Sequence, residues 1–122
     1  MFSPALDVSP TAVQVMLSGQ VATRADGGVV DPADPAQQIR QVYDNLHAAI
    51  CAAGGAGLTD LVRTTVYLVS AELIAIFYQV RAELYPVVFG ERPRPASTLV
   101  VVSALVDPRY LVEIDGVAAI ER

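Results

Sequence analysis

Residues 98–120 read TLVVVSALVDPRYLVEIDGVAAI, and this stretch decides the fold that the sequence predicts. Two apolar runs, residues 98–105 and 110–120, flank Val106-Asp107-Pro108-Arg109, whose composition is typical of a turn. We therefore expect two strands joined as a hairpin. Because the first run is apolar on both of its alternating faces, the sheet that holds it must be covered on both sides.

The preceding sequence supplies the other strands. Residues 11–23 begin with the alternation of a strand, with Val13, Val15 and Leu17 on one side and Ala12, Gln14 and Met16 on the other. A turn at residues 24–28 leads to a short return strand at residues 29–30. Residues 61–69 are rich in β-branched and aromatic side chains and are predicted to form a further strand.

Two helices are expected between these strands. Asp34, Pro35 and Gln37 form a helix start, in which the Asp caps free N–H groups and the Pro occupies the first helical position. This helix is expected to end at Gly54. A second apolar stripe at helical spacing covers about residues 71–88 and is closed by Pro86 and Gly90.

The resulting order, β-β-α-β-α-β-β, predicts an α+β fold with one mixed sheet and both helices on one face. No linker or internal repeat divides the chain, so residues 1–122 are interpreted as a single domain. Hydrophobic residues make up 53% of the chain, more than a domain of this size can bury in its own core. A second subunit is therefore expected to cover the other face of the sheet.

Composition excludes several classes of function. The chain has 13 acidic and 8 basic residues, a net charge of −5, and every basic residue is Arg. Schiff-base chemistry and a phosphate-binding Walker lysine are excluded because there is no Lys. One His and one Cys leave too few ligands for a metal site, and we expect no cofactor.

The same numbers bear on partners and location. Nucleic acid binding needs clustered positive charge, so we expect no nucleic acid partner. No apolar run approaches the roughly 20 residues that span a bilayer, so no membrane association is expected. Residues 1–10 lack the basic and apolar regions of a secretory signal, and the single Cys fits a reducing compartment, which together favour the cytoplasm.

Two residues in strands could line a ligand site. Gly19 follows a strand, where it marks either a β-bulge or a backbone position that a ligand approaches closely. Glu113 interrupts an apolar strand and shares one face with Asp115. Its carboxylate either faces solvent or lines a pocket, where it could hold a water or act as a base. Arg63 and Arg81 are expected at the surface.

Short motifs recur along nearly the whole chain in one order. They are Ser18-Gly19-Gln20, Asn45-Leu46, Ala53-Gly54, Val62-Arg63-Thr64-Thr65-Val66-Tyr67-Leu68, Phe77 with Tyr85 and Phe89, Arg94-Pro95-Ala96, and Val112-Glu113-Ile114. In this order and spacing the chain resembles the reactive intermediate deaminase (Rid, or YjgF-like) family.

The resemblance implies a chorismate-mutase-like α+β fold assembled as a homotrimer, with small-molecule clefts between subunits. Active members of the family hydrolyse 2-imino or enamine acids to 2-keto acids and ammonia. In those members an Arg that follows Pro-Ala clamps the substrate carboxylate, and a Glu at the position of Glu113 positions the attacking water.

This chain departs from the family at the carboxylate clamp. Ser97 follows Pro95-Ala96 where an Arg is usual, and Leu99 stands where many members have Cys. Arg81 aligns with a position where members commonly have Asn. The hydroxyl of Ser97 cannot replace the bidentate contact that a guanidinium makes with a substrate carboxylate. The candidate site therefore has Glu113 as its catalytic residue and Ser18, Gly19, Arg81, Arg94, Ser97 and Leu99 as its substrate-binding residues.

Three functions follow from this pattern. The first is hydrolysis or another conversion of an imine, enamine or related carbonyl compound other than a simple 2-imino acid. The second is a non-catalytic module that binds a metabolite or a protein. Ribonuclease activity, sometimes attributed to the family, is disfavoured by the net charge of −5.

Overall fold

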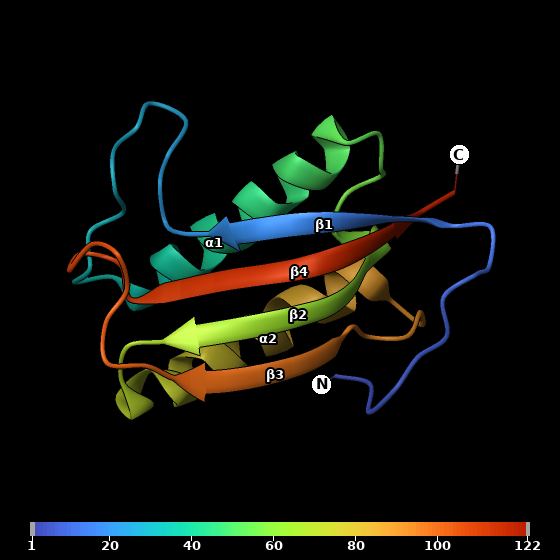
Figure 1. Cartoon of the computed structure of the whole chain (residues 1–122). Helices are drawn as coiled ribbons and strands as arrows, with labels where there is room; N and C mark the ends of the chain where they lie inside the picture. Colours follow the sequence, from blue (N-terminus) through green and yellow to red (C-terminus); the bar gives the residue numbers. More distant parts are fainter. Residues whose placement is uncertain (1, 122) are drawn as a thin grey trace.

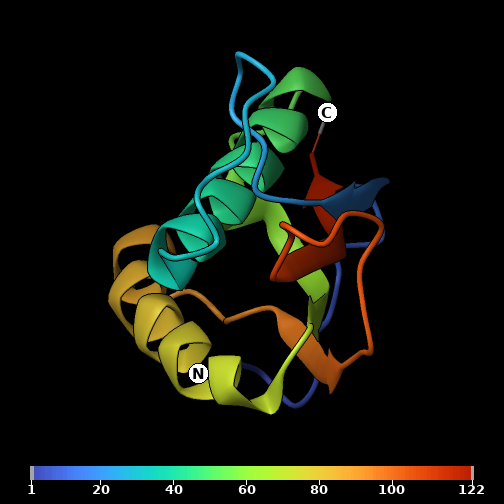
Figure 2. The same ribbon diagram turned by 90° about the vertical axis from the view of Figure 1, so that its left-hand side faces the viewer.

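The computed structural model describes residues 2–121, which form two helices packed on one face of a four-stranded sheet (Figure 1). Across the sheet the strand order is β1-β4-β2-β3; β2 and β3 are parallel, and the other neighbouring pairs are antiparallel. The elements are β1 (Val13–Gln20), α1 (Pro35–Ala52), β2 (Leu61–Leu68), α2 (Ile74–Phe89), β3 (Ala96–Val101) and β4 (Val112–Ile120), with short 3-10 turns η1 (Leu58–Asp60) and η2 (Ala71–Leu73). The α+β class with both helices on one face is thus confirmed (Figure 2).

The predicted helix starts are largely confirmed. The Asp34 side chain accepts a hydrogen bond from the Gln37 backbone N–H at 3.2 Å, and Pro35 is the first residue of α1. The second helix begins later than residue 71, because η2 precedes it. Pro86 lies inside α2 rather than at its end, and the helix ends at Gly90, whose φ of +57° favours glycine.

The predicted hairpin of residues 98–120 is wrong. Strand β2 lies between β3 and β4 and pairs with both of them. Because β3 runs parallel to β2, the chain must cross from one side of β2 to the other before β4 begins, and residues 102–111 make that crossing. The return strand at residues 29–30 is also wrong, since only an isolated bridge pairs Thr23 with Val29. The sheet therefore has four strands instead of five.

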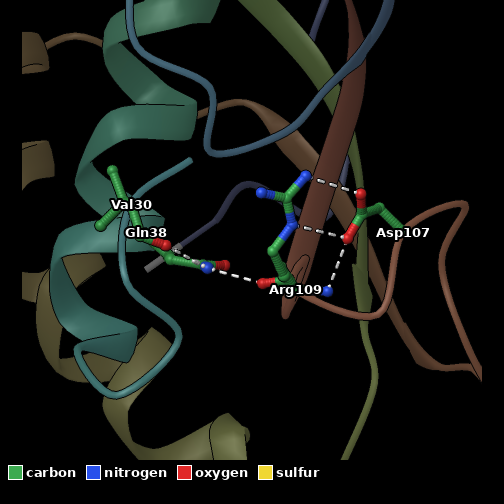
Figure 3. A network of polar contacts seen from close by, with 4 residues as sticks. All are labelled: Val30, Gln38, Asp107 and Arg109. Atoms are coloured by element: carbon green, nitrogen blue, oxygen red, sulfur yellow. Dashed lines mark hydrogen bonds and ion pairs between the residues drawn. The ribbon is translucent and has the colours of Figure 1, made fainter. Parts of the chain in front are cut away.

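The crossing segment is anchored by a buried glutamine of α1 (Figure 3). The Gln38 side-chain amide donates to the backbone carbonyls of Val30 and Arg109 at 2.8 Å each, and its carbonyl accepts from the Leu111 N–H at 3.0 Å. Arg109 is further tied to Asp107 by a salt bridge at 2.9 Å. One side chain thus satisfies three backbone groups that would otherwise lack partners away from water.

Strict alternation along β4 separates the two faces of the sheet. Val112, Ile114, Ala118 and Ile120 are buried under the helices, whereas the intervening residues are half-buried on the opposite face. Among residues 2–121, both helices lie on the first face, and no helix covers the opposite one (Figure 2). We refer to it below as the open face. Within residues 2–121 there is no helix with the length and hydrophobicity needed to cross a bilayer.

Candidate functional site

The Glu113 carboxyl group lies on the open face, directly against the backbone of Gly19. A Cβ atom at position 19 would lie 2.8 Å from the Glu113 Cδ atom and closer still to its Oε2 atom. That distance is shorter than any that real Cβ atoms show. A side chain at position 19 would therefore displace the Glu113 carboxyl group from this position.

A β-bulge creates this approach. Leu17 pairs with Gly116 and Gln20 pairs with Ile114, so three steps along β1 oppose two steps along β4. The extra residue falls at Ser18-Gly19, as the first interpretation of Gly19 predicted. The second interpretation, the close approach of a ligand, stays a prediction; within the chain the group that lies against the Gly19 backbone is the Glu113 carboxyl.

One polar residue beside Glu113, Tyr67, could not be assigned from the sequence. Tyr67 is the cross-strand partner of Glu113, and its hydroxyl donates a 3.0 Å hydrogen bond to the Asp115 Oδ2 atom. This hydrogen bond, together with the negative charge of Asp115, raises the pKa of Tyr67. Tyr67 therefore remains a neutral proton donor beside the carboxylate. Placing Tyr67 opposite Glu113 requires the pairing register of β2 with β4. The alternation of side chains within each strand does not reveal that register.

Ser97 and Leu99 lie on the other side of the sheet. Ser97 accepts a 3.0 Å hydrogen bond from the Thr64 hydroxyl, and Thr64 is buried under the helices. Leu99 is partly buried and packs against the hydrophobic core. Neither residue meets Glu113 within one chain.

The two candidate arginines have different environments. Arg94 donates from Nη1 to the Gly90 and Arg92 carbonyl oxygens at 2.8 and 3.3 Å, so it ties the end of α2 to the segment before β3. Its guanidinium also stacks 5.8 Å from the Phe89 ring centre. Arg81 is only 2% exposed, so its expected surface position is wrong.

None of the candidate residues lines the hollow beside α1 or the hollow on the open face. A hollow of about 550 Å³ beside α1 is lined by residues such as Asp34, Arg40 and Tyr43 and by none of the candidates. A second, of about 250 Å³, lies on the open face beside Arg63 and Val117. Within residues 2–121 no three His, Cys, Asp or Glu side chains are close enough to hold a metal ion.

Comparison with known proteins agrees with this geometry. A family model described as Endoribonuclease L-PSP matches residues 2–120. A conserved Rid family protein of Yersinia pestis has the same fold, with a TM-score of 0.81 and 30% identity over 98% of this chain and 86% of that one. The chain belongs to the Rid family.

Other Rid relatives support the assignment. A RutC family protein of Pyrococcus horikoshii is 35% identical over 105 residues, which are 85% of this chain and 77% of that protein. The YjgF gene product of E. coli has a TM-score of 0.77 and 27% identity, over 99% of this chain and 94% of that one. The predicted resemblance is confirmed at the level of family and fold.

Proposed function

We propose that this Rid protein hydrolyses an imine, an enamine or a related carbonyl intermediate, other than a simple 2-imino acid, with Glu113 orienting the attacking water. The observation that carries the proposal is the placement of the Glu113 carboxyl group against the Gly19 backbone on the open face. A residue that serves only solubility does not need a glycine opposite its carboxylate.

The chemistry that this pair supports is addition of water to a C=N bond. Glu113 takes one proton as the water oxygen bonds to the imine carbon and passes it to the nitrogen, which gives a carbinolamine. The second proton leaves the carbinolamine hydroxyl and reaches the nitrogen as the C=O bond forms and the C–N bond breaks. An imine and one water give one carbonyl compound and one ammonia. A carboxylate that holds the water in line contributes about 10²- to 10⁴-fold to such a step.

Assembly into a homotrimer would turn the open face into a cleft. Met16 and Val100 lie on this face and are 65% and 38% exposed in the single chain. Exposed apolar side chains on a sheet face without helices are typical of a subunit interface. A second subunit packed here would exclude bulk water from Glu113, which strengthens its interaction with a bound ligand.

The substrate class follows from Ser97. Its uncharged hydroxyl accepts a hydrogen bond from Thr64 on the helix side of the sheet, so the position that usually carries the Arg clamp offers no charge to a substrate carboxylate on the open face. A substrate that reaches Glu113 is therefore neutral or is held by other groups. Binding of a metabolite without turnover is the alternative.

Two measurements test the proposal together. Light scattering should give three copies of the 12.9 kDa chain at micromolar concentration. Ammonia release should then be measured over a panel of imines and enamines generated in situ, with and without a carboxylate group. Turnover by the trimer supports the enzyme, whereas saturable binding without turnover supports the binding module. Because the matching family model is described as an endoribonuclease, a single-stranded RNA should be included, and its cleavage would contradict the proposal.

A further inference from the structure

The guanidinium of Arg81 is buried without an acidic partner. Within residues 2–121 the salt bridges are Arg40 with Glu83 and Arg109 with Asp107, and neither involves Arg81. The Arg81 Nε atom is fully buried and has no hydrogen-bond partner there. A buried cation in this state pays a large desolvation cost, so native structures normally supply it with an anion.

Four aromatic rings surround this guanidinium. Its Cζ atom lies 4.9 Å from the ring centre of Tyr78, 5.2 Å from Phe77, 5.8 Å from Tyr85 and 5.9 Å from Phe2. These distances are within the range of cation–π attraction, which offsets part of the cost of burial. Ring faces accept no conventional hydrogen bonds, however, so they leave the buried Nε–H group without an acceptor.

The nearby phenol groups do not supply the missing negative charge. Burial raises the pKa of Tyr43 well above its ordinary value and also raises the pKa of Tyr85. Both residues therefore remain neutral, and their hydroxyl oxygens lie 3.2 Å from one another. The site thus keeps one uncompensated positive charge.

The outer wall of this aromatic cage is partly exposed to solvent. Phe2 and Tyr78 are 49% and 46% exposed, whereas Phe77 and Tyr85 are buried. The segment that carries Phe2 is joined to the end of the α2–β3 connection by a hydrogen bond from the Ser3 N–H to the Pro95 carbonyl at 3.2 Å. Moving the Phe2 ring into solvent would uncover the guanidinium and leave a space the size of that ring.

We propose that Arg81 anchors a binding site for a small organic carboxylate, with the Phe2 ring closing the site when it is empty. A carboxylate matches the fork of N–H donors on a guanidinium, and a single cation neutralises a single negative charge. Inorganic phosphate would keep part of its charge uncompensated among aromatic rings. The aromatic walls favour a carboxylate with an apolar or planar remainder.

This site is separate from the Glu113 site in the chain. Arg81 belongs to the helix layer, and Glu113 lies on the open face of the sheet. Binding at Arg81 can therefore be measured without a substrate for hydrolysis, so the outcome does not depend on whether the proposed enzyme activity is found.

The test is calorimetric titration of the full chain with benzoate, its neutral isostere benzamide, and inorganic phosphate. Benzoate should bind saturably, and the other two should bind at least 10-fold more weakly. Arg81→Met should weaken benzoate binding by roughly 10- to 100-fold, the value of a charge-assisted hydrogen bond. Arg81→Lys should weaken it as well, because an ammonium lacks the fork.

Phe2→Ala should strengthen benzoate binding, because no ring then has to move. Arg40→Met is the matched control: it removes one positive charge from the exposed surface of α1 and should leave binding unchanged. Should Arg81→Met fold poorly, Arg81→Lys and Phe2→Ala still decide the question. The proposal is overturned if wild-type protein shows no saturable benzoate binding, if phosphate binds as tightly as benzoate, or if either Arg81 variant binds like wild type.

Discussion

Substitution of Gly19 by Ala should displace the Glu113 carboxyl group without unfolding the protein. The added Cβ would lie 2.8 Å from the Glu113 Cδ atom, whereas ordinary contacts begin at 3.4 Å. The carboxyl carbon must therefore retreat by about 0.6 Å, and the nearer Oε2 atom must retreat further. Because the obstructing atoms are the end of a flexible side chain, the side chain will move and the backbone will not.

A displacement near 1 Å at a catalytic group costs about 10²-fold in rate, which corresponds to about 2.7 kcal/mol. Gly19→Ala should therefore lower ammonia release by about 10²-fold on any substrate that the panel identifies. Gly19 does not have a positive φ, so Ala adopts its backbone conformation, and the free energy of unfolding should change by less than about 1 kcal/mol.

Gly116→Ala provides the contrast. A Cβ atom at position 116 would lie 2.5 Å from the backbone oxygen of Arg63, and backbone in the middle of a sheet cannot give way. This variant should lose about 1–3 kcal/mol of stability. A folded Gly19→Ala protein with full turnover would refute the placement of Glu113 as the group that orients water.

Three further predictions concern stability, ionisation and substrate range. Gln38→Leu removes one buried and two part-buried hydrogen bonds to the backbone and should cost up to about 3 kcal/mol in chemical denaturation, at about 1 kcal/mol for each; a loss below 1 kcal/mol would contradict this. Hydrogen bonds from Arg109 lower the pKa of Asp107 to about 2 in the folded state from an ordinary value of 3.8. The contribution of Asp107 to stability is therefore complete above about pH 4 and is lost as the pH falls through 2. Carbon NMR of the folded protein should show the Asp107 carboxyl titrating with a midpoint of about 2, and a midpoint near 3.8 would be inconsistent with the contact to Arg109. Because Ser97 replaces the usual Arg, ammonia release from 2-iminopropanoate should be roughly 30- to several-thousand-fold slower than from the best substrate of the panel, and equal rates would count against the altered substrate class.

The spacing of hydrophobic residues predicted most helices and strands, but it could not predict which strands pair with one another. Residues 61–69 and 98–105 were both recognised as strands; β2 occupies nearly all of the first range, whereas β3 begins two residues earlier than the second range and ends at Val101, half-way through it. The hairpin was wrong because the sequence between two strands does not show that a third strand, β2, separates them in the sheet. Long-range pairing depends on which faces fit together, and that is not encoded in local turn signals.

The site was predicted only in part for the same reason. Gly19 and Glu113 were identified from their chemistry and the family pattern, and the structure brings them into contact. Tyr67 could be placed beside Glu113 only once the register of β2 and β4 was known. The burial of Arg81 was missed because a lone arginine in a helix is usually at the surface, and its aromatic surroundings come partly from Phe2, far away in the sequence.

The central claim is that the Glu113 carboxylate activates water, and turnover by Glu113→Gln tests it most directly. The amide has the same shape but cannot take a proton, so turnover should fall by about 10²- to 10⁴-fold while the oligomeric state and melting temperature stay unchanged. Glu83→Gln, on the exposed surface of α2, is the matched control and should retain full activity. Full turnover by a folded Glu113→Gln protein would contradict the account.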